Sequence, residues 1–84
     1  MPYQVCINRS AEKELDALQS NISARIINRL LQLEENPRPY GVKKLQGQEA
    51  YRLRVGNYRI LYTINDAEQL LIIYAIGHRG EVYR

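Results

Sequence analysis

Apolar and polar residues follow regular spacings along the 84 residues of the chain, and these spacings predict its elements. Residues 3–8 alternate between apolar and polar side chains, which is typical of a strand with one buried face. Apolar residues then recur at three- and four-residue spacing over 11–18 and 22–33, which predicts two amphipathic helices. The stripe of the second helix consists of Ile22, Ile26, Ile27, Leu30, Leu31 and Leu33. Both stripes are expected to pack against a sheet as a helical hairpin.

Residues with known capping preferences indicate where the two helices begin and end. Ser10 is the expected N-cap of the first helix, and Ser20-Asn21 interrupts the pattern and is expected to cap the second. The second helix is expected to end at NPRPYG (36–41), because the residue before a proline disfavours helical backbone.

Three strand-like runs fill the second half of the chain, at 51–55, 58–64 and 70–78. The short connections at Gly56-Asn57 and 65–69 predict an antiparallel meander. The last run is apolar through its centre, as expected of a strand that is covered on both faces. The predicted order is β-α-α-β-β-β. Residues 1–84 are therefore expected to form one α+β domain, an antiparallel sheet covered by an N-terminal helical hairpin.

Composition and charge narrow the classes of function. The chain is 45% apolar and 25% charged, which is ordinary for a globular protein. Its net charge of +3 comes entirely from residues 43–84, which favours an anionic partner at that half. Cys6 is the single cysteine, which excludes an internal disulfide, and no apolar run approaches membrane-spanning length. We therefore expect a cytoplasmic protein with no membrane partner.

The hairpin at 51–62 sets like charges against each other. If Gly56-Asn57 is a two-residue loop, Arg54 lies opposite Arg59, and Arg52 shares their face. We call Arg52, Arg54 and Arg59 the arginine face. A solvated polar face is the alternative interpretation, but no acidic residue lies on this face to balance the arginines. Guanidinium groups hold phosphate in a fixed fork of donors, so an anionic phosphate ligand is favoured.

The C-terminal segment is expected to reach the rim of the arginine face. The last strand runs antiparallel to the one that holds Arg59, which brings His78, Arg79 and Tyr83 toward it. The alternatives are a surface histidine and a tyrosine that anchors the C-terminus. A catalytic serine, an acidic pair at metal spacing and a glycine-rich phosphate loop are not found in the sequence. No metal site and no cofactor are predicted.

The order of these motifs resembles RelE-type toxins of the RelE/ParE superfamily. The resemblance spans the strand, the helical hairpin that ends in Asn36-Pro37, KKLQG (43–47), YRLRVGNYRILY (51–62) and IGHRGEVY (76–83). It implies a RelE-like fold and the toxin of a type II toxin–antitoxin system, a stress-response class. It also implies ribosome-dependent cleavage of A-site mRNA, which inhibits translation. The implied partners are a cognate antitoxin and the ribosome, with operator DNA contacted only through the antitoxin.

The same resemblance implies roles for individual residues. Arg59 matches the residue that stabilises the scissile phosphate, Arg79 the one that protonates the leaving group, and Tyr83 the general base. Because arginine is a poor proton donor, His78 is a further candidate acid. Basic residues expected to contact RNA are Lys43, Lys44, Arg52 and Arg54. The implied reaction is attack of a ribose 2′-OH on the adjacent phosphate, giving a 2′,3′-cyclic phosphate without a metal ion.

Two other functions stay open at the level of sequence. One is a ParE-like inhibitor of DNA gyrase, which shares the fold but generally lacks the basic and tyrosine set. The other is a catalytically inactive toxin fold that acts within an antitoxin–operator complex. The five residues Arg52, Arg54, Arg59, Arg79 and Tyr83 together favour the endoribonuclease.

Overall fold

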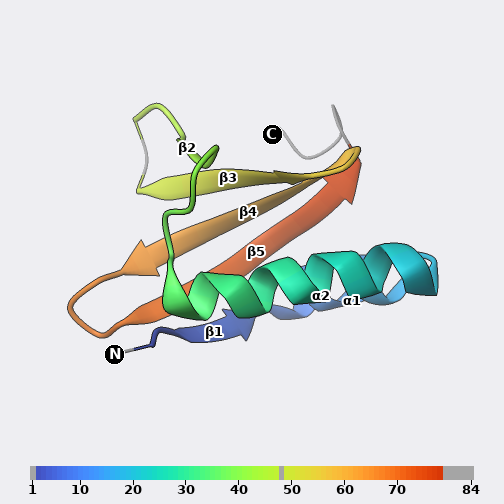
Figure 1. Cartoon of the computed structure of the whole chain (residues 1–84), viewed down its shortest axis with the longest axis horizontal. Coiled ribbons are helices and arrows are strands. Elements are labelled where there is room, and N and C mark those ends of the chain that lie inside the picture. The colour runs from blue at the N-terminus through green and yellow to red at the C-terminus, as the bar shows by residue number, and fades with distance from the viewer. Residues whose placement is uncertain (1, 48, 79–84) are drawn as a thin grey trace.

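The computed structural model describes residues 2–47 and 49–78, so Arg79 and Tyr83 lie outside the described residues. Two helices and five strands follow one another along the chain (Figure 1). Their bounds are β1 Gln4–Ile7, α1 Arg9–Asp16, α2 Ser20–Glu35, β2 Lys43–Lys44, β3 Ala50–Val55, β4 Tyr58–Asn65 and β5 Leu70–His78. The predicted α+β class is confirmed.

The five strands form one mixed sheet in the order β1-β5-β4-β3-β2. Neighbours β2 to β5 pair antiparallel, whereas β1 pairs parallel to β5. A purely antiparallel sheet was therefore wrong for the first strand. Side-chain alternation does not encode the direction of a strand, and the helices between β1 and the meander supply the crossover that a parallel pair needs. The short β2 was also missed, because two residues show no period.

The hairpin of β3 and β4 has the predicted register. Val55 lies opposite Tyr58 and Arg54 opposite Arg59, so Gly56-Asn57 is a two-residue loop. Gly56 has a φ of 60°, whereas Asn57 is not among the residues with positive φ. A positive φ at the first loop position alone is the pattern of a type II′ turn, in which glycine is favoured.

The helix starts differ from the predicted caps. Asn8, rather than Ser10, caps α1, since its Oδ1 accepts a hydrogen bond of 2.8 Å from the amide of Ala11. Ser20 is the first residue of α2, and the N-cap position is held by Gln19, whose side chain makes no capping hydrogen bond. The predicted end of α2 before Pro37 is confirmed.

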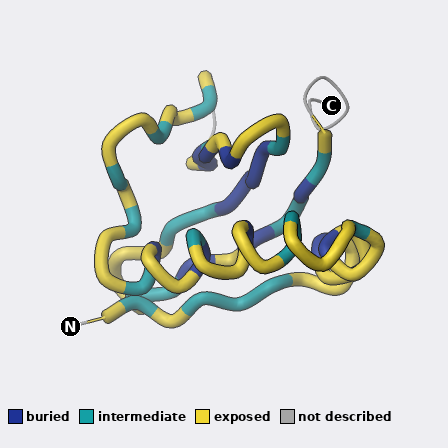
Figure 2. The backbone as a smooth tube through the Cα atoms, turned by 45° about the vertical axis from the view of Figure 1, so that its right-hand side comes forward, coloured by how far each residue is buried: buried dark blue, intermediate teal, exposed yellow. Residues whose placement is uncertain are grey.

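Both helices lie on one face of the sheet, and the hydrophobic core fills the space between the helices and the sheet (Figures 1 and 2). The helical core residues are Ala11, Leu15, Ile26, Leu30 and Leu33. The sheet contributes Tyr51, Leu53, Val55, Ile60, Tyr62, Leu71, Ile73 and Ile76. The prediction that Ile27 and Leu31 belong to this core was wrong, because they are 44% and 55% exposed. They lie one turn apart on the side of α2 that faces away from the core.

Within residues 2–47 and 49–78, no helix covers the opposite face of the sheet. Ile72 in β5 is 39% exposed, so the prediction of a strand covered on both faces was wrong. An apolar run alone does not show on which face each residue lies, and the burial of β5 varies from residue to residue along the strand. No helix within the described ranges is long and apolar enough to cross a membrane.

Helix α1 closes the edge of β5 beyond the end of β1. The amide of Asn8 donates to the carbonyl of Ile73 at 3.0 Å, and the amide of Ile76 donates to Oε1 of Glu14 at 2.9 Å. A register shift between Leu61 and Tyr62 disturbs the β4–β5 ladder along this same stretch. A side chain of α1 therefore satisfies a buried strand amide that no neighbouring strand can reach.

Candidate active site

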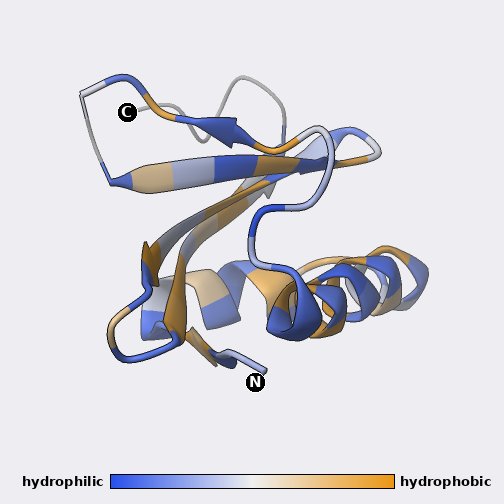
Figure 3. Ribbon diagram, turned by 60° about the vertical axis from the view of Figure 1, so that its left-hand side comes forward, coloured by the Kyte–Doolittle hydropathy of each residue, from blue (hydrophilic) through white to orange (hydrophobic). Residues whose placement is uncertain are grey.

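The arginine face lies on the side of the sheet that the helices leave uncovered. Residues opposite each other on paired strands share a face, so the Arg54–Arg59 pair and Arg52 point away from Leu53 and Ile60 in the core. Bands of alternating hydropathy mark this division along β3 (Figure 3). Pairing across the hairpin thus brings the three arginines together as the sequence predicts.

The three arginines differ in burial. Arg54 is exposed and Arg52 is half-buried, but Arg59 is only 7% exposed. Arg59 lies on β4, the middle strand of the sheet, beside the buried Leu61. The alternative interpretation, a polar face that simply points into water, does not account for the burial of Arg59. A charge held in a partly dehydrated site interacts more strongly with an anion than a fully solvated charge does.

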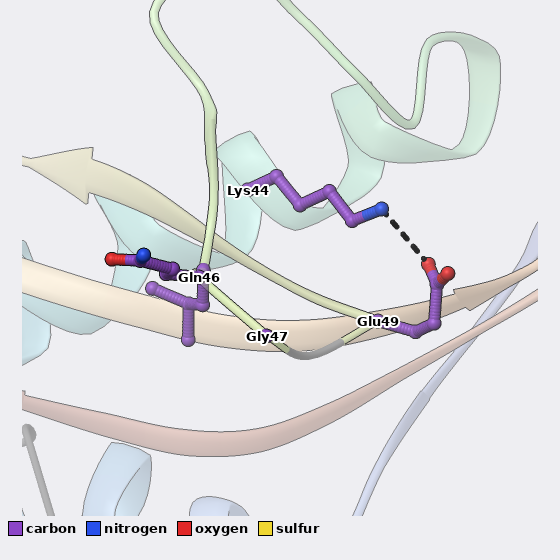
Figure 4. Close-up of a pocket in the computed structure, with 5 residues that line it drawn as sticks. Lys44, Gln46, Gly47 and Glu49 are labelled. Carbon is purple, nitrogen blue, oxygen red and sulfur yellow. Dashed lines mark ion pairs between the residues drawn. The ribbon is translucent and has the colours of Figure 1, made fainter.

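Only one of the two predicted lysines joins the arginine face. Lys43 is the Cα partner of Arg52 and shares its face, whereas Lys44 is the partner of Tyr51 and shares the other. Nζ of Lys44 lies 3.4 Å from Oε2 of Glu49, as the dashed line in Figure 4 marks. Among the described residues, four of the predicted RNA- or phosphate-binding residues share this face. They are Lys43, Arg52, Arg54 and Arg59.

His78 does not lie on the arginine face, contrary to its predicted placement. Its Cα partner on β4 is Tyr58, while the partner of Arg59 is Gly77. The imidazole meets the ring of Tyr58 edge-on, with 5.3 Å between ring centroids and 84° between planes. The direction of β5 was predicted well, but alternation along the strand turns residue 78 toward the helical side. Arg79 and Tyr83 lie outside the described residues.

A second polar cluster, which the sequence did not reveal, joins the loop after α2 to the β4–β5 loop. Arg38 donates to both carboxylate oxygens of Asp66, at 2.9 and 3.2 Å, and its Nε donates to the hydroxyl of Tyr51 at 3.2 Å. The hydroxyl of Tyr3 donates to Oδ1 of Asp66 at 2.6 Å. The Arg38 and Tyr3 hydrogen bonds hold the pKa of Asp66 below its ordinary value.

This second cluster is a structural feature. Asp66 follows the last residue of β4, whereas Arg59 is near its start, so about 23 Å of strand separates them. The hydroxyl of Tyr62 also donates to the carbonyl of Pro37 at 2.8 Å, and burial raises the pKa of this phenol. The position of Arg38 between two prolines was the available signal, since such a segment is rigid and holds the guanidinium in place. No three His, Cys, Asp or Glu side chains within 2–47 and 49–78 gather as metal ligands.

Comparison with known proteins extends these observations to the family. Residues 5–83 match the family described as the ParE toxin of the type II toxin–antitoxin system parDE. Toxin RelG of Mycobacterium tuberculosis is 32% identical, over 100% of this chain and 99% of that protein.

Solved structures agree with this assignment. The archaeal RelE–RelB complex of Pyrococcus horikoshii has a TM-score of 0.86 and 31% identity, covering 98% of this chain and 100% of the matched one. The RelBE2 toxin–antitoxin complex of Mycobacterium tuberculosis has a TM-score of 0.84 and 28% identity, covering 94% and 100%. The chain therefore belongs to the RelE/ParE superfamily of type II toxin–antitoxin toxins, and it is a RelE-type member.

Proposed function

We propose that the protein is a ribosome-dependent mRNA endoribonuclease that cuts through attack of a ribose 2′-OH on the adjacent phosphate. The observation that carries this proposal is the meeting of Lys43, Arg52, Arg54 and Arg59 on the sheet face opposite the helices, with Arg54 directly opposite Arg59. Like charges opposite each other cost a sheet up to about 1 kcal/mol. A phosphate group of RNA bound on this face offsets that repulsion.

The reaction needs stabilisation of negative charge more than it needs a bound cofactor. As the 2′-oxygen attacks, the phosphorane gains a charge that Arg59 stabilises from its partly dehydrated position. The exposed Arg54 and the half-buried Arg52 hold the flanking phosphates. This division of roles agrees with the graded burial of the three side chains.

Proton transfer rests on residues that the family resemblance assigns. Tyr83 is the proposed general base that accepts the 2′-OH proton, and Arg79 assists departure of the 5′-oxygen. Both residues lie outside the described residues. His78 is left out of the proposed site because it lies beside Tyr58 on the helical side. Tyr83→Phe is expected to slow cleavage by roughly 10² to 10⁴, whereas His78→Gln is expected to stay within a few-fold of the unsubstituted protein.

The proposed partners follow from the site and from the relatives. The related toxins of Pyrococcus horikoshii and Mycobacterium tuberculosis were solved in complexes with RelB-type antitoxins. We propose a cognate antitoxin for this chain as well, with operator DNA contacted only through that antitoxin. Ribosome-bound mRNA as substrate implies action in the cytoplasm. A small basic face with few groups that read bases depends on the ribosome to position its substrate.

The direct test is incubation of the purified protein with programmed ribosomes, followed by mapping of the cut sites. We expect cleavage within the A-site codon, 2′,3′-cyclic phosphate and 5′-OH ends, and little cleavage of naked mRNA. Adding a chelator after ribosome integrity has been controlled should leave the rate unchanged. Intact mRNA together with inhibited supercoiling by DNA gyrase would instead assign the protein to the ParE-like function that the matched family's name suggests.

A further inference from the structure

The arginine face continues, toward the other end of β3, into a shallow apolar depression of about 510 Å³. Its lining residues are Glu49, Ala50, Thr63, Ile72 and Tyr74. Ala50 lies opposite Thr63 and Thr63 opposite Ile72, so three neighbouring strands contribute to the same face. Because Ala50 precedes Arg52 by two residues, the depression and the arginines share that face.

The residues that line the depression suit contact with the flat ring of a base. Two of them are small, the buried Ala50 and the half-buried Thr63. Two others offer apolar surface, the phenol ring of Tyr74 and the 39% exposed side chain of Ile72. Burial raises the pKa of Tyr74, so its ring stays neutral next to a polyanion. Aromatic rings that lie beside basic residues are the usual platforms on which single-stranded RNA stacks its bases.

Charges around the depression separate the place for a base from the place for a phosphate. Arg52 follows Ala50 by about 7 Å along β3, and Arg59 precedes Thr63 by about 13 Å along β4. The phosphates of a strand that crosses the sheet therefore meet guanidinium groups on one side. Glu49 also lines the depression, but its carboxylate is paired with Lys44, so the guanidinium groups lie on the Arg52 side and the apolar lining is left for a base.

We propose that this depression is a nucleobase subsite, which receives one unstacked base of single-stranded RNA against Tyr74 and Ile72. The base belongs to a nucleotide near the scissile phosphate but separate from it, because the depression lies several residues along the strands from Arg59. The inference rests on the proposed function, since it names where the same RNA substrate is held. It makes Tyr74 and Ile72 substrate-binding residues that set a preference for flanking sequence.

The test is a cycle of RNA and protein changes on stalled ribosomes. An abasic nucleotide is introduced at one position at a time on either side of the cut, and single-turnover rates are measured. At one position, loss of the base should slow cleavage by the unsubstituted protein by about 5- to 100-fold. Tyr74→Ala should show a similar loss with intact RNA and no further loss with that abasic RNA. Tyr74→Phe keeps the ring and should retain both the rate and the abasic effect.

A matched pair of isoleucines controls for general loss of apolar surface. Ile72→Ala is expected to weaken the abasic effect, whereas Ile27→Ala removes the same atoms from a similarly exposed side chain on the helical side and should not. Thermal unfolding of each variant shows whether the fold is intact. If the rate loss from the missing base and the rate loss from Tyr74→Ala multiply at every position, the two changes act independently, and the proposal is overturned. So would unchanged cleavage by Tyr74→Ala together with weakened binding of a purified antitoxin, which would assign the depression to a protein partner.

Failure of the subsite and failure of the proposed function give different results. If the unsubstituted protein cuts no ribosome-bound mRNA, the proposed function fails. The same cycle is then measured as equilibrium binding of a short oligoribonucleotide to the purified protein. Coupling between the missing base and Tyr74 in that binding would still support the subsite, and its absence would overturn it.

Discussion

Arg59 combines two properties that rarely occur together, a permanent charge and near-complete burial. It lies on the middle strand of the sheet and faces Arg54 across the hairpin. A buried guanidinium on a face that also holds Arg52 and Arg54 forms a site of concentrated positive charge, which suits an anionic ligand. The effect of Arg59 on stability and its effect on phosphate binding can be separated by experiment.

Replacing Arg59 with methionine should separate them. Methionine keeps much of the buried stem but removes the charge and its repulsion with Arg54. We expect a variant that still folds, because methionine fills much of the same buried space, with cleavage slowed by about 10² or more. Urea unfolding and single-turnover cleavage measure the two effects, and Arg9→Met on the exposed start of α1 is the control. A variant that is inactive because it is unfolded would contradict this role for Arg59.

At the scale of elements, α1 covers the part of the β5 edge that β1 does not pair with. β1 pairs with β5 only as far as Ile73, and beyond it Glu14 accepts the hydrogen bond of the Ile76 amide. A short helix thus takes over the hydrogen bonding that a longer edge strand would provide. The register shift between Leu61 and Tyr62 lies next to this stretch, so α1 also stabilises an irregular part of the ladder.

Loss of the Glu14 carboxylate should therefore destabilise the whole fold. Glu14→Ala leaves the amide of Ile76 without its acceptor, and because this hydrogen bond is partly buried the loss should lie at or below the roughly 1–3 kcal/mol of a buried unsatisfied donor. Glu14→Gln keeps a carbonyl oxygen and should recover most of the loss. Urea unfolding of the two variants gives the comparison. Equal stability of Glu14→Ala and the unsubstituted protein would show that water satisfies this amide.

Sequence reasoning succeeded where a local pattern determines the structure. Alternation and a two-residue loop were enough to pair Arg54 with Arg59, because pairing in a tight hairpin leaves little choice of register. It failed where a property depends on a distant neighbour. The apolar run of β5 does not reveal that Ile72 is exposed, and the sequence does not distinguish Ile27 from Ile26 although only Ile26 faces the core. The face on which His78 lies depends on the alternation of residues along β5 as well as on the direction of the strand.

At the scale of the whole molecule, the cluster around Arg38 and Asp66 connects segments from both halves of the chain. Tyr3 precedes β1, Arg38 follows α2, and Asp66 begins the loop between β4 and β5. The ring of Tyr51 lies 5.2 Å from the Arg38 guanidinium carbon. Four distant segments therefore share one network, which makes its contribution to stability dependent on the charge of Asp66.

That dependence predicts a change of stability with pH. The pKa of Asp66 is lower in the folded state, so its contribution is complete above the unfolded value of about 4 and is lost as pH falls through the folded value. Asp66→Asn should be less stable than the unsubstituted protein at pH 7, and the difference should shrink toward pH 2. Urea unfolding at both pH values tests this, with Glu68→Gln in the same exposed loop as control. A difference that stays constant with pH would exclude the charge of Asp66 as the cause.

The two-residue β2 forms one edge of the sheet and limits association of protein copies through that edge. An edge strand offers unpaired backbone groups to any strand of a second molecule, and long apolar edges lead to self-association. Here that edge is very short and consists of two exposed lysines, of which Lys44 is partly balanced by Glu49. Two molecules that approach through β2 bring like charges together, so this edge resists polymerisation at low ionic strength. Salt shortens the range of that repulsion to about 10 Å at 0.1 M. Concentrated protein should therefore stay dispersed for longer in a buffer of low salt concentration than in one of about 0.1 M or more.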